Sequence, residues 1–479
     1  MNEKQLDAAV LKSFPPVDEE KVDALLATEI AASGFKIVVL DDDPTGVQTV
    51  HDISVYTDWN EDSIRAGFME ENKVFYILTN SRGFTEAETV AAHTQIAERV
   101  ARVGRELDRP YVVISRSDST LRGHYPLETM VLKDVLEKNQ APAIDGEVLC
   151  PYFNAGGRFT INDVHYVKEG DKLTPAGQTE FAKDKTFGYR SSNMKEYIEE
   201  KTKGAYPASS VTGISLEDTR ALAIDKIQAQ LMAVNGFNKV IVNAVDNVDV
   251  KVFCIALYRA MAAGKRFMFR TAAGIVKIMG GITDIPLLTR KDMVTRETDK
   301  GGIIVVGSHT AKTTAQLEAM RGLPGLSFME FRSDLVLDEE KFEAEKARVQ
   351  AWAEEQIEQG MTPVIYTNRR LLVVENDTPE EALVRSVKIS DAVQSFVGNL
   401  QVTPAFVIAK GGITSSDVGT KALKVRRANV LGQIRPGIPV WQTKEESRFP
   451  ATPYVIFPGN VGDVDTLREA AQILMEKDQ

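Results

Sequence analysis

The stretch IVVLDDDPTGVQT, residues 37–49, passes from four apolar residues directly into three aspartates, a proline, a threonine and a glycine. The apolar run predicts a buried strand, and ligands of α/β sheets bind where such strands end. Because three adjacent carboxylates repel one another, a hydroxyl, a cation or backbone donors must lie close to them. Asp43, or its neighbour Asp42, is then placed to accept a proton from a hydroxyl group. An Asx-type turn that caps the next element is the alternative interpretation.

The same kind of apolar run recurs along the chain, with amphipathic helical stretches between the runs. Besides residues 36–40, the runs are 74–78, 111–114, 240–243, 303–306, 364–367 and 406–409. Helix start signals include the capping box that begins at Thr85 and the proline that follows Thr378. This alternation predicts an α/β fold of two domains, each with a mostly parallel sheet flanked by helices.

The length of 479 residues favours two or three domains. Residues 289–300 are charged and lack a sustained apolar face, and the strand rhythm restarts after them. We therefore expect a helical extension over residues 1–33, a first domain over 34–290 and a second over 300–479. The active site is expected in the cleft between the two domains.

Composition narrows the class of protein. The net charge is −11, and no dense block of lysine and arginine stands out, so neither nucleic acid nor an anionic membrane is an expected partner. Cys150 and Cys254 lack metal-ligand spacing, and the five histidines form no HExxH motif, so we expect no metal site in the protein itself. Neither a secretory signal nor an apolar stretch of membrane-spanning length is present, and a cytoplasmic location is expected. Oligomeric state cannot be read from these features.

A second polar stretch, SRSDSTLRG at residues 115–123, also follows an apolar strand. It places Arg116 and Arg122 beside hydroxyl groups and Asp118, a mixture that suits a polyol bearing a carboxylate. The alternative is that Asp118 pairs with an arginine and the run caps a helix. Residues 80–83, which include Arg82, have the same character, and the loop 152–158 is either a substrate cover or a plain turn.

The second half contains two turns that are suited to phosphate. In VVGSHTAKTTAQ, residues 305–316, a strand passes through Gly307 into a helix whose exposed N–H groups can hold an anion. The stretch is not a Walker A loop, because Ala311 replaces the second glycine and the loop is one residue short. A similar turn, GGITSS at residues 411–416, follows the strand at 406–410. Together the turns predict a nucleotide site, whereas singly each is an ordinary βα turn.

In this order, the motifs resemble those of the four-carbon acid sugar kinase family, over roughly residues 35–470. The main anchors are DDPTG at 42–46 and DSTLRG at 118–123. Weaker agreement comes from Gly157-Arg158, from FAKD at 181–184, from RTAA at 270–273, and from the glycine turns of the second half.

The resemblance implies a sugar-acid domain followed by an ATP domain, and transfer of a phosphoryl group to a hydroxyl, expected to be the terminal one, of threonate, erythronate or a 3-oxo-tetronate. Asp43 and Asp42 are the implied catalytic residues. The implied substrate contacts are Arg82, Arg116, Asp118, Ser119, Thr120, Arg122, Gly157 and Arg158. The implied nucleotide contacts are Gly307, Ser308, Gly411, Gly412, Thr414, Gly437, Gly459, Asn460 and Gly462. Mg²⁺ is expected to arrive on the phosphates of ATP.

Three departures leave the identity of the acid open. Arg116 stands where many relatives have lysine, Asp41 and Pro44 replace the usual apolar flanks of the paired aspartates, and residues 1–34 have no recognised counterpart in the family.

Two other functions are weighed against a kinase. Asp41 and Asp43 have the spacing of the nucleophile motif in haloacid-dehalogenase-type phosphatases, but the acidic run at residues 462–465 has the wrong spacing for the partner motif. A non-catalytic sensor of sugar acids would use the same arginines, but it gives no reason for the glycine turns of the second half.

Overall fold

The computed structural model describes residues 3–139, 142–296, 298–370, 372, 374, 377–459 and 461–476. The chain forms two compact units. The first comprises Met1–Gly46 and Asp58–Asp284, and the second comprises Val47–Thr57 and Ile285–Gln479. The segment that follows the aspartates therefore belongs to the second unit, which no pattern in the sequence indicated.

The first unit is built on a parallel sheet whose strands are continuous apolar runs, as expected when helices cover both faces. Its strand β2 (Lys36–Asp41) is buried along its whole length. The neighbours of β2 are β4 (Val74–Leu78) and β5 (Tyr111–Arg116). Beyond β5 the parallel order continues with β12 (Phe267–Thr271), β6 (Gly146–Cys150), β11 (Asn238–Val242) and β10 (Thr212–Ile214).

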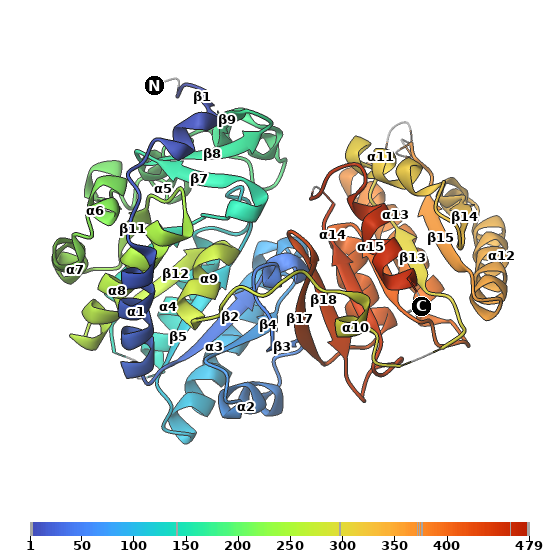
Figure 1. Ribbon diagram of the computed structural model, residues 1–479, viewed down its shortest axis with the longest axis horizontal. Coiled ribbons are helices and arrows are strands. Elements are labelled where there is room, and N and C mark those ends of the chain that lie inside the picture. The colour runs from blue at the N-terminus through green and yellow to red at the C-terminus, as the bar shows by residue number, and fades with distance from the viewer. Residues whose placement is uncertain are drawn as a thin grey trace. The chain divides into compact units, whose positions relative to one another are not determined.

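Two layers of helices cover this sheet (Figure 1). One layer contains α2 (Glu61–Met69), α3 (Glu86–Glu106) and α4 (Leu127–Lys138), and α3 begins at the expected capping box of Thr85 and Glu88. The other gathers around α8 and contains α1 (Glu19–Ala32), α6 (Leu216–Arg220), α7 (Ile224–Ala233), α8 (Asn247–Ala262) and α9 (Ala273–Gly280). A further helix, α5 (Met194–Lys201), contacts β11.

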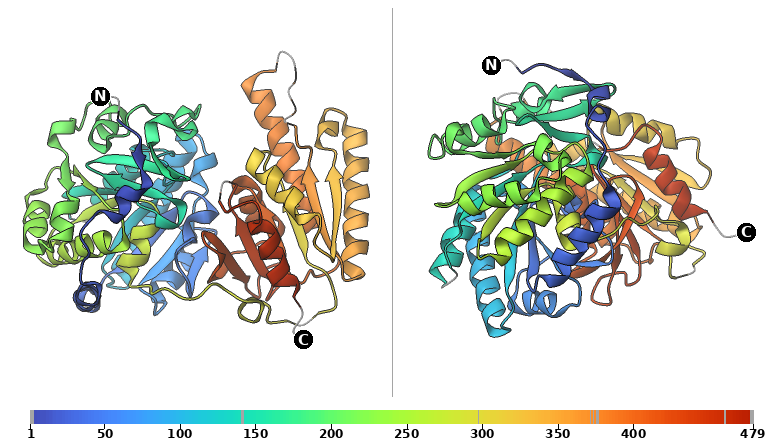
Figure 2. Two further views of the ribbon diagram at one scale, coloured as in Figure 1. Left: turned by 45° about the horizontal axis from the view of Figure 1, so that its top comes forward. Right: turned by 60° about the vertical axis from the view of Figure 1, so that its left-hand side comes forward.

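The N-terminal residues pack on the first unit in two places. A small antiparallel sheet has the order β1 (Leu6–Asp7), β9 (Lys172–Pro175), β8 (Val164–Glu169) and β7 (Arg158–Ile161), so β1 is its edge strand. The dark blue helix α1 lies beside α8 in Figures 1 and 2. There Arg259 Nε lies 2.7 Å from Glu29 Oε1.

The second unit combines a parallel and an antiparallel part. The strands β19 (Pro453–Phe457), β16 (Val407–Lys410), β13 (Ile303–Val306), β15 (Thr362–Thr367) and β14 (Leu326–Phe331) run parallel in this order. On the other side of β19, the antiparallel strands are β18 (Ile438–Thr443), β17 (Arg427–Arg435) and β3 (Ile53–Tyr56). The sequence patterns predicted the parallel strands β13, β15 and β16, but they did not predict this antiparallel part.

Helices pack on both faces of the second unit's parallel strands (Figure 2). α11 (Ala311–Met320), α15 (Thr466–Met475) and α10 (Arg290–Met293) form one group, and α12 (Glu339–Glu358), α13 (Pro379–Gly398) and α14 (Gly412–Asp417) form the other. The α/β architecture expected from the sequence is therefore present. In the described part of the chain, no helix combines the length and the apolar character that crossing a membrane requires.

A buried ion pair joins two neighbouring strands of the first unit and allows a test of this packing. Lys239 on β11 lies opposite Glu147 on β6, their charged atoms are 2.7 Å apart, and neither side chain is exposed. Glu147→Gln would leave the lysine buried without its partner, so we expect a loss of about 3 kcal/mol in the free energy of unfolding.

Chemical denaturation measures this loss. Glu106→Gln, which removes an exposed ion pair with Arg65, serves as the control and should cost less than about 1 kcal/mol. Replacing both buried partners, by Glu147→Leu with Lys239→Met, should recover most of the stability, because no charge is then left unpaired. An unchanged stability of Glu147→Gln would contradict this account.

Candidate functional site

The three aspartates lie at the carboxyl end of β2, where the strand order of the sheet places the ends of β4 and β5 on either side of them. Asp41 is the last residue of β2, and the short helix Pro44–Val47 follows the group. The side chains of Asp41 and Asp42 are 1% and 2% exposed, whereas that of Asp43 is 14% exposed. Of the three carboxylates, Asp43 is therefore the most accessible to a ligand.

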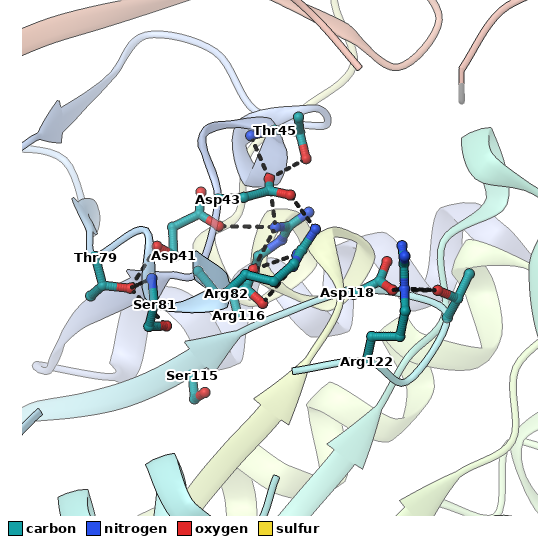
Figure 3. A network of polar contacts seen from close by, with 12 residues as sticks. Asp41, Asp43, Thr45, Thr79, Ser81, Arg82, Ser115, Arg116, Asp118 and Arg122 are labelled. Atoms are coloured by element: carbon teal, nitrogen blue, oxygen red, sulfur yellow. Dashed lines mark hydrogen bonds and ion pairs between the residues drawn. The ribbon is translucent and has the colours of Figure 1, made fainter. Parts of the chain in front are cut away.

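Two arginines from the neighbouring strand ends hold these carboxylates (Figure 3). Arg82, which follows β4, binds both oxygens of Asp42 through Nε at 3.1 Å and Nη2 at 2.6 Å, and it also pairs with Asp43. Arg116, the last residue of β5, places Nη1 3.0, 3.3 and 3.5 Å from oxygens of Asp41, Asp42 and Asp43. Both guanidinium groups are thus bound to the aspartates.

The pKa values of the three carboxyl groups shift in different directions. Burial raises the pKa of Asp41 well above its usual value, although the positive charge of Arg116 opposes the shift. Burial also raises the pKa of Asp42, and there the positive charge of Arg82 opposes the shift. Burial would raise the pKa of Asp43 too, but Arg82, Arg116 and hydrogen bonds from Thr45 outweigh it and lower this pKa. Of the three, Asp43 is therefore the one whose ionised form its surroundings favour.

The glycine of the DDPTG motif is required by the fold of this loop. A Cβ atom on Gly46 would lie 2.1 Å from the carboxylate oxygens of Asp41, so no side chain fits there. Asp43 Oδ1 accepts hydrogen bonds from the backbone N–H of Thr45 at 2.8 Å and from its hydroxyl. The Asx-type turn of the alternative interpretation is thus present, in the same carboxylate that binds Arg82.

A second buried ion pair lies next to the aspartate group, beside Ser81 and Ser115, and the sequence analysis did not identify it. Glu128 on α4 pairs with Arg270 on β12 and accepts hydrogen bonds from Ser81 at 2.7 Å and Ser115 at 3.1 Å. Gly123, at φ +114°, makes room for this group, because a Cβ there would lie 2.6 Å from Arg270 Nη2. Arg270 stood in a family motif, but Glu128 lies within a helix without any local signal.

The loop after β5 forms a further polar group. Asp118 accepts a hydrogen bond from Arg122 Nε at 2.6 Å and one from the Thr120 hydroxyl. The backbone carbonyl of Ser119 bonds His165 Nε2 at 2.8 Å, and the hydroxyl of Tyr189 donates to the carbonyl of Thr120 at 2.7 Å. The pairing of Asp118 with an arginine, which was the alternative interpretation, therefore occurs.

Arg158 joins this group from the first residue of β7, after Gly157, which has φ +73°. The guanidinium carbons of Arg122 and Arg158 lie 5.1 and 5.7 Å from the centre of the Phe181 ring. Burial lowers the pKa of Arg158, and Asp118 opposes the shift only through longer-range attraction. Within the described part of the chain, no carboxylate lies at ion-pair distance from Arg158, whose Nε is buried without a hydrogen bond. This arginine is available to an anion.

The glycine turns of the second unit meet at the carboxyl ends of β13, β16 and β19. A Cβ on Gly307 would lie 2.1 Å from Thr414 Oγ1, and one on Gly411, at φ +122°, would lie 3.3 Å from Ser308 Cβ. Gly412 begins α14, and a Cβ there would meet nothing within 4 Å. Gly307, Ser308, Gly411 and Thr414, predicted from two separate motifs, are thus in contact.

The remaining predicted turns border the same group. A Cβ on Gly459 would lie 3.7 Å from Ser308 Oγ. Gly437, in the turn between β17 and β18, would place a Cβ 3.1 Å from Val461, next to Gly462. Asn460 lies outside the described residues.

Two cations that the sequence analysis did not select also border these turns. Arg369 Nη2 donates to the carbonyl of Ser308 at 2.6 Å. Lys410 ends β16 with its side chain buried, and its ammonium donates to the carbonyls of Pro458 at 2.5 Å and Gly459 at 3.2 Å. Burial, aided by repulsion from Lys312, lowers the pKa of Lys410 to about 7. No acidic side chain in the described ranges pairs with Lys410, so this site suits an anion such as a nucleotide phosphate.

One group of carboxylates is close enough to share a cation. Oxygens of Asp41, Asp42 and Asp43 all lie within 4.8 Å of one another. Arg82 and Arg116 already supply positive charge to this group.

Comparison with known protein families identifies two domains in the chain. Residues 37–279 match the model of a sugar-binding N-terminal domain, and residues 303–467 match that of a nucleotide-binding C-terminal domain. The chain belongs to the family that joins these two domains, the four-carbon acid sugar kinase architecture.

Solved structures agree with this fold. A Haemophilus influenzae protein from a domain family of unknown function is similar, with a TM-score of 0.58 and 18% identity over 92% of this chain and 100% of its own. A Salmonella typhimurium LT2 protein, provisionally called a tRNA synthase, has a TM-score of 0.65 and 15% identity over 91% of this chain and 98% of its own. No curated protein matches the chain.

The lowered pKa of Lys410 predicts a pH-dependence of nucleotide binding. Above about pH 7 the free protein loses the ammonium proton, whereas a bound polyphosphate would favour its return, so binding takes up a proton. We expect the affinity for MgATP to fall with rising pH above 7, by up to about tenfold per pH unit.

Calorimetry in buffers of different ionisation enthalpy counts this proton. Lys410→Met should abolish the uptake, and Lys300→Met, which changes a partly exposed lysine at the other end of the strands, should leave it unchanged. Equal proton uptake by the wild type and Lys410→Met would remove Lys410 from the site.

Proposed function

We propose that this protein is an ATP-dependent kinase that phosphorylates a hydroxyl, the terminal one, of a four-carbon sugar acid such as threonate, erythronate or a 3-oxo-tetronate. One observation carries the proposal. At one edge of the first unit's sheet, Asp43 has a lowered pKa and is accessible, and Arg158, at the start of β7, has no acidic partner among the described residues. A sugar acid has the two matching groups, a hydroxyl and a carboxylate.

The charges between these two residues form a continuous series. Asp43 pairs with Arg82, Arg82 is attracted to Asp118, and Asp118 pairs with Arg122, which shares the Phe181 ring with Arg158. In our proposal, Arg158 and Arg122 bind the carboxylate of the acid, since a guanidinium group offers a planar pair of donors. The hydroxyls of Ser119 and Thr120, together with the loop at Gly157, contact the hydroxyls of the acid.

The other two arginines have a different part. Because Arg82 and Arg116 are bound to the aspartates, we assign them to holding Asp43 in place rather than to holding the carboxylate of the acid. Asp42 is too buried to reach a substrate, so it positions Arg82. Arg82 and Arg116 would also offset negative charge near the acceptor hydroxyl.

Asp43 acts on the acceptor hydroxyl. Its lowered pKa makes it a weak base, but phosphoryl transfer passes through a loose transition state in which the nucleophile needs alignment more than early deprotonation. Asp43 would accept a hydrogen bond from the hydroxyl, orient its lone pair, and take the proton as the new bond forms.

The second unit would hold the nucleotide. Bound MgATP supplies the phosphoryl group, and Mg²⁺ on the phosphate oxygens lowers their charge. Lys410 would hold the turn at residues 458–459 in place. The residues proposed to contact the nucleotide lie in the converging turns and are Gly307, Ser308, Gly411, Gly412, Thr414, Gly437, Gly459 and Gly462.

The phosphatase alternative fits the geometry less well. It requires Asp41 as an exposed nucleophile, whereas Asp41 is 1% exposed, has a raised pKa and touches Arg116. A sensor would bind the acid without transferring phosphate, so an assay of ADP formation separates a sensor from a kinase.

Asp43→Asn should lower the turnover number for ATP-dependent phosphorylation by roughly a hundredfold to ten-thousandfold, because the amide cannot accept the hydroxyl proton. ADP formation in the presence of threonate, erythronate and 3-oxo-tetronates measures this turnover. Asp62→Asn, on the exposed face of α2, is the control and should be unaffected.

Near-normal turnover of Asp43→Asn would exclude Asp43 as the group that accepts the hydroxyl proton. Absence of ADP formation with every acid, while calorimetry still detects acid binding to the wild type, would instead favour the sensor.

Arg158→Gln should raise the Michaelis constant for the sugar acid by roughly tenfold to a hundredfold, the value of a charged hydrogen bond to a carboxylate, with little change in turnover. The uncharged four-carbon polyol erythritol lacks the carboxylate, so its weaker binding should not change. Arg190→Gln, whose side chain is 90% exposed, is the matched control. An equal effect of Arg158→Gln on acid and polyol would contradict a carboxylate contact.

A further inference from the structure

A cavity of about 670 Å³ lies in the first unit, at the sheet edge opposite to the aspartates. Its walls include Tyr111, where β5 begins, and Phe267, where β12 begins, while the far ends of the same strands carry Arg116 and Arg270. Packing voids in protein interiors are rarely larger than a water molecule, whereas ligand pockets measure roughly 300–1,000 Å³. The volume is therefore that of a pocket for a small molecule.

The walls of the cavity are mainly apolar and aromatic. Phe35 and Tyr258 stack with ring centres 5.4 Å apart and planes 13° apart, and both line the cavity. Tyr111, Met261 and Met268 add further apolar surface. Flat rings and flexible thioethers of this kind accommodate a ring or a short chain.

The charged groups around the cavity are mostly positive. Four cations line it, Arg105, Arg109, Lys265 and Arg266, against two acids, Glu29 and Asp108. Glu29 is neutralised by Arg259 and Lys265 by Asp145, which leaves three arginines against one aspartate.

These arginines keep donors for a ligand. Arg105 donates one N–H to the carbonyl of Asn139, and Arg266 donates one to the carbonyl of Pro142. Each guanidinium group has five N–H donors, so most of them are left for a ligand. Helix carboxyl ends nearby carry partial negative charge, about half a unit each, and offset only part of this excess.

One wall of the cavity comes from outside the recognised domain. Glu29 and residues 32–35, at the end of α1 and in the turn before β2, line the cavity, whereas the sugar-binding domain model begins at residue 37. The N-terminal helix, held against α8, thus completes a pocket that the domain alone would leave open.

We propose that this cavity is a second binding site, separate from the phosphoryl-transfer site, for a small amphipathic anion. The ligand has an apolar ring or short chain that lies against Phe35, Tyr111 and Tyr258, and a single carboxylate, sulfonate or phosphate that meets Arg109 and its neighbours. The proposal does not depend on the kinase reaction.

The test uses anilinonaphthalenesulfonate, a fluorescent aromatic anion, as the probe on the full-length folded protein. We expect saturable binding of one molecule with a rise in fluorescence. Its uncharged analogue phenylnaphthylamine should bind more weakly, by about threefold or more, since it lacks the anion. Excess MgATP should not displace the probe, because the nucleotide turns lie in the other unit.

Two pairs of variants locate the probe. Ala262→Trp and Ala32→Trp place a bulky ring on two different walls and should weaken binding by about tenfold or more. The controls Ala263→Trp and Ala31→Trp change neighbouring exposed alanines that do not line the cavity, and should bind as the wild type does. Thermal unfolding checks that each variant is folded, and two walls keep the test decisive if one variant is not.

A third pair tests the charge. Arg109→Gln should weaken binding of the anionic probe by about threefold and leave the uncharged probe unaffected. Arg102→Gln, an exposed arginine of α3 paired with Glu61, is the control. Wild-type binding by both folded tryptophan variants, or displacement by MgATP, would overturn the site, and equal binding of the two probes would overturn its preference for anions.

Discussion

Three consecutive carboxylates removed from water would be strongly destabilising if they were left alone. Here β2 delivers Asp41, Asp42 and Asp43 to one point, and the strands on its two sides deliver Arg82 and Arg116 to the same point. This compensation depends on a parallel sheet, because only parallel neighbours bring their carboxyl ends to one edge. The position of the proposed site follows from that single constraint.

The compensation also separates the roles of similar side chains. Asp41 and Asp42 are buried with raised pKa values, and Asp43, one residue further on, is ionised and accessible. Arg82 and Arg116, at the carboxyl ends of β4 and β5, are paired with aspartates. Arg158, on the small antiparallel sheet, has no acidic partner within the described residues. A row of chemically similar residues thus supplies both scaffold and binding groups.

The second unit solves a different problem with different residues. Its turns approach closely because glycine has no side chain, and not because of opposite charges. A Cβ at Gly307 would collide with Thr414. Lys410 adds a cation whose environment disfavours its charge, so the turns and the lysine together suit an anion that restores it. The proposed phosphoryl transfer rests on both features, the carboxylates positioned by arginines and the glycine turns positioned by close packing.

The sequence by itself determined the α/β class, the parallel strands and the residues at their ends, because apolar runs that stop at polar or glycine residues are local features. It also placed Gly307 and Gly411 in turns, since only glycine fits so close an approach. It could not determine that Arg82 and Arg116 pair with the three aspartates, or that Glu128 pairs with Arg270 from within a helix. It also gave no sign that β3 pairs with β17, far along the chain. Those outcomes depend on which strands become neighbours, and pairing between distant segments is decided only when the whole chain packs.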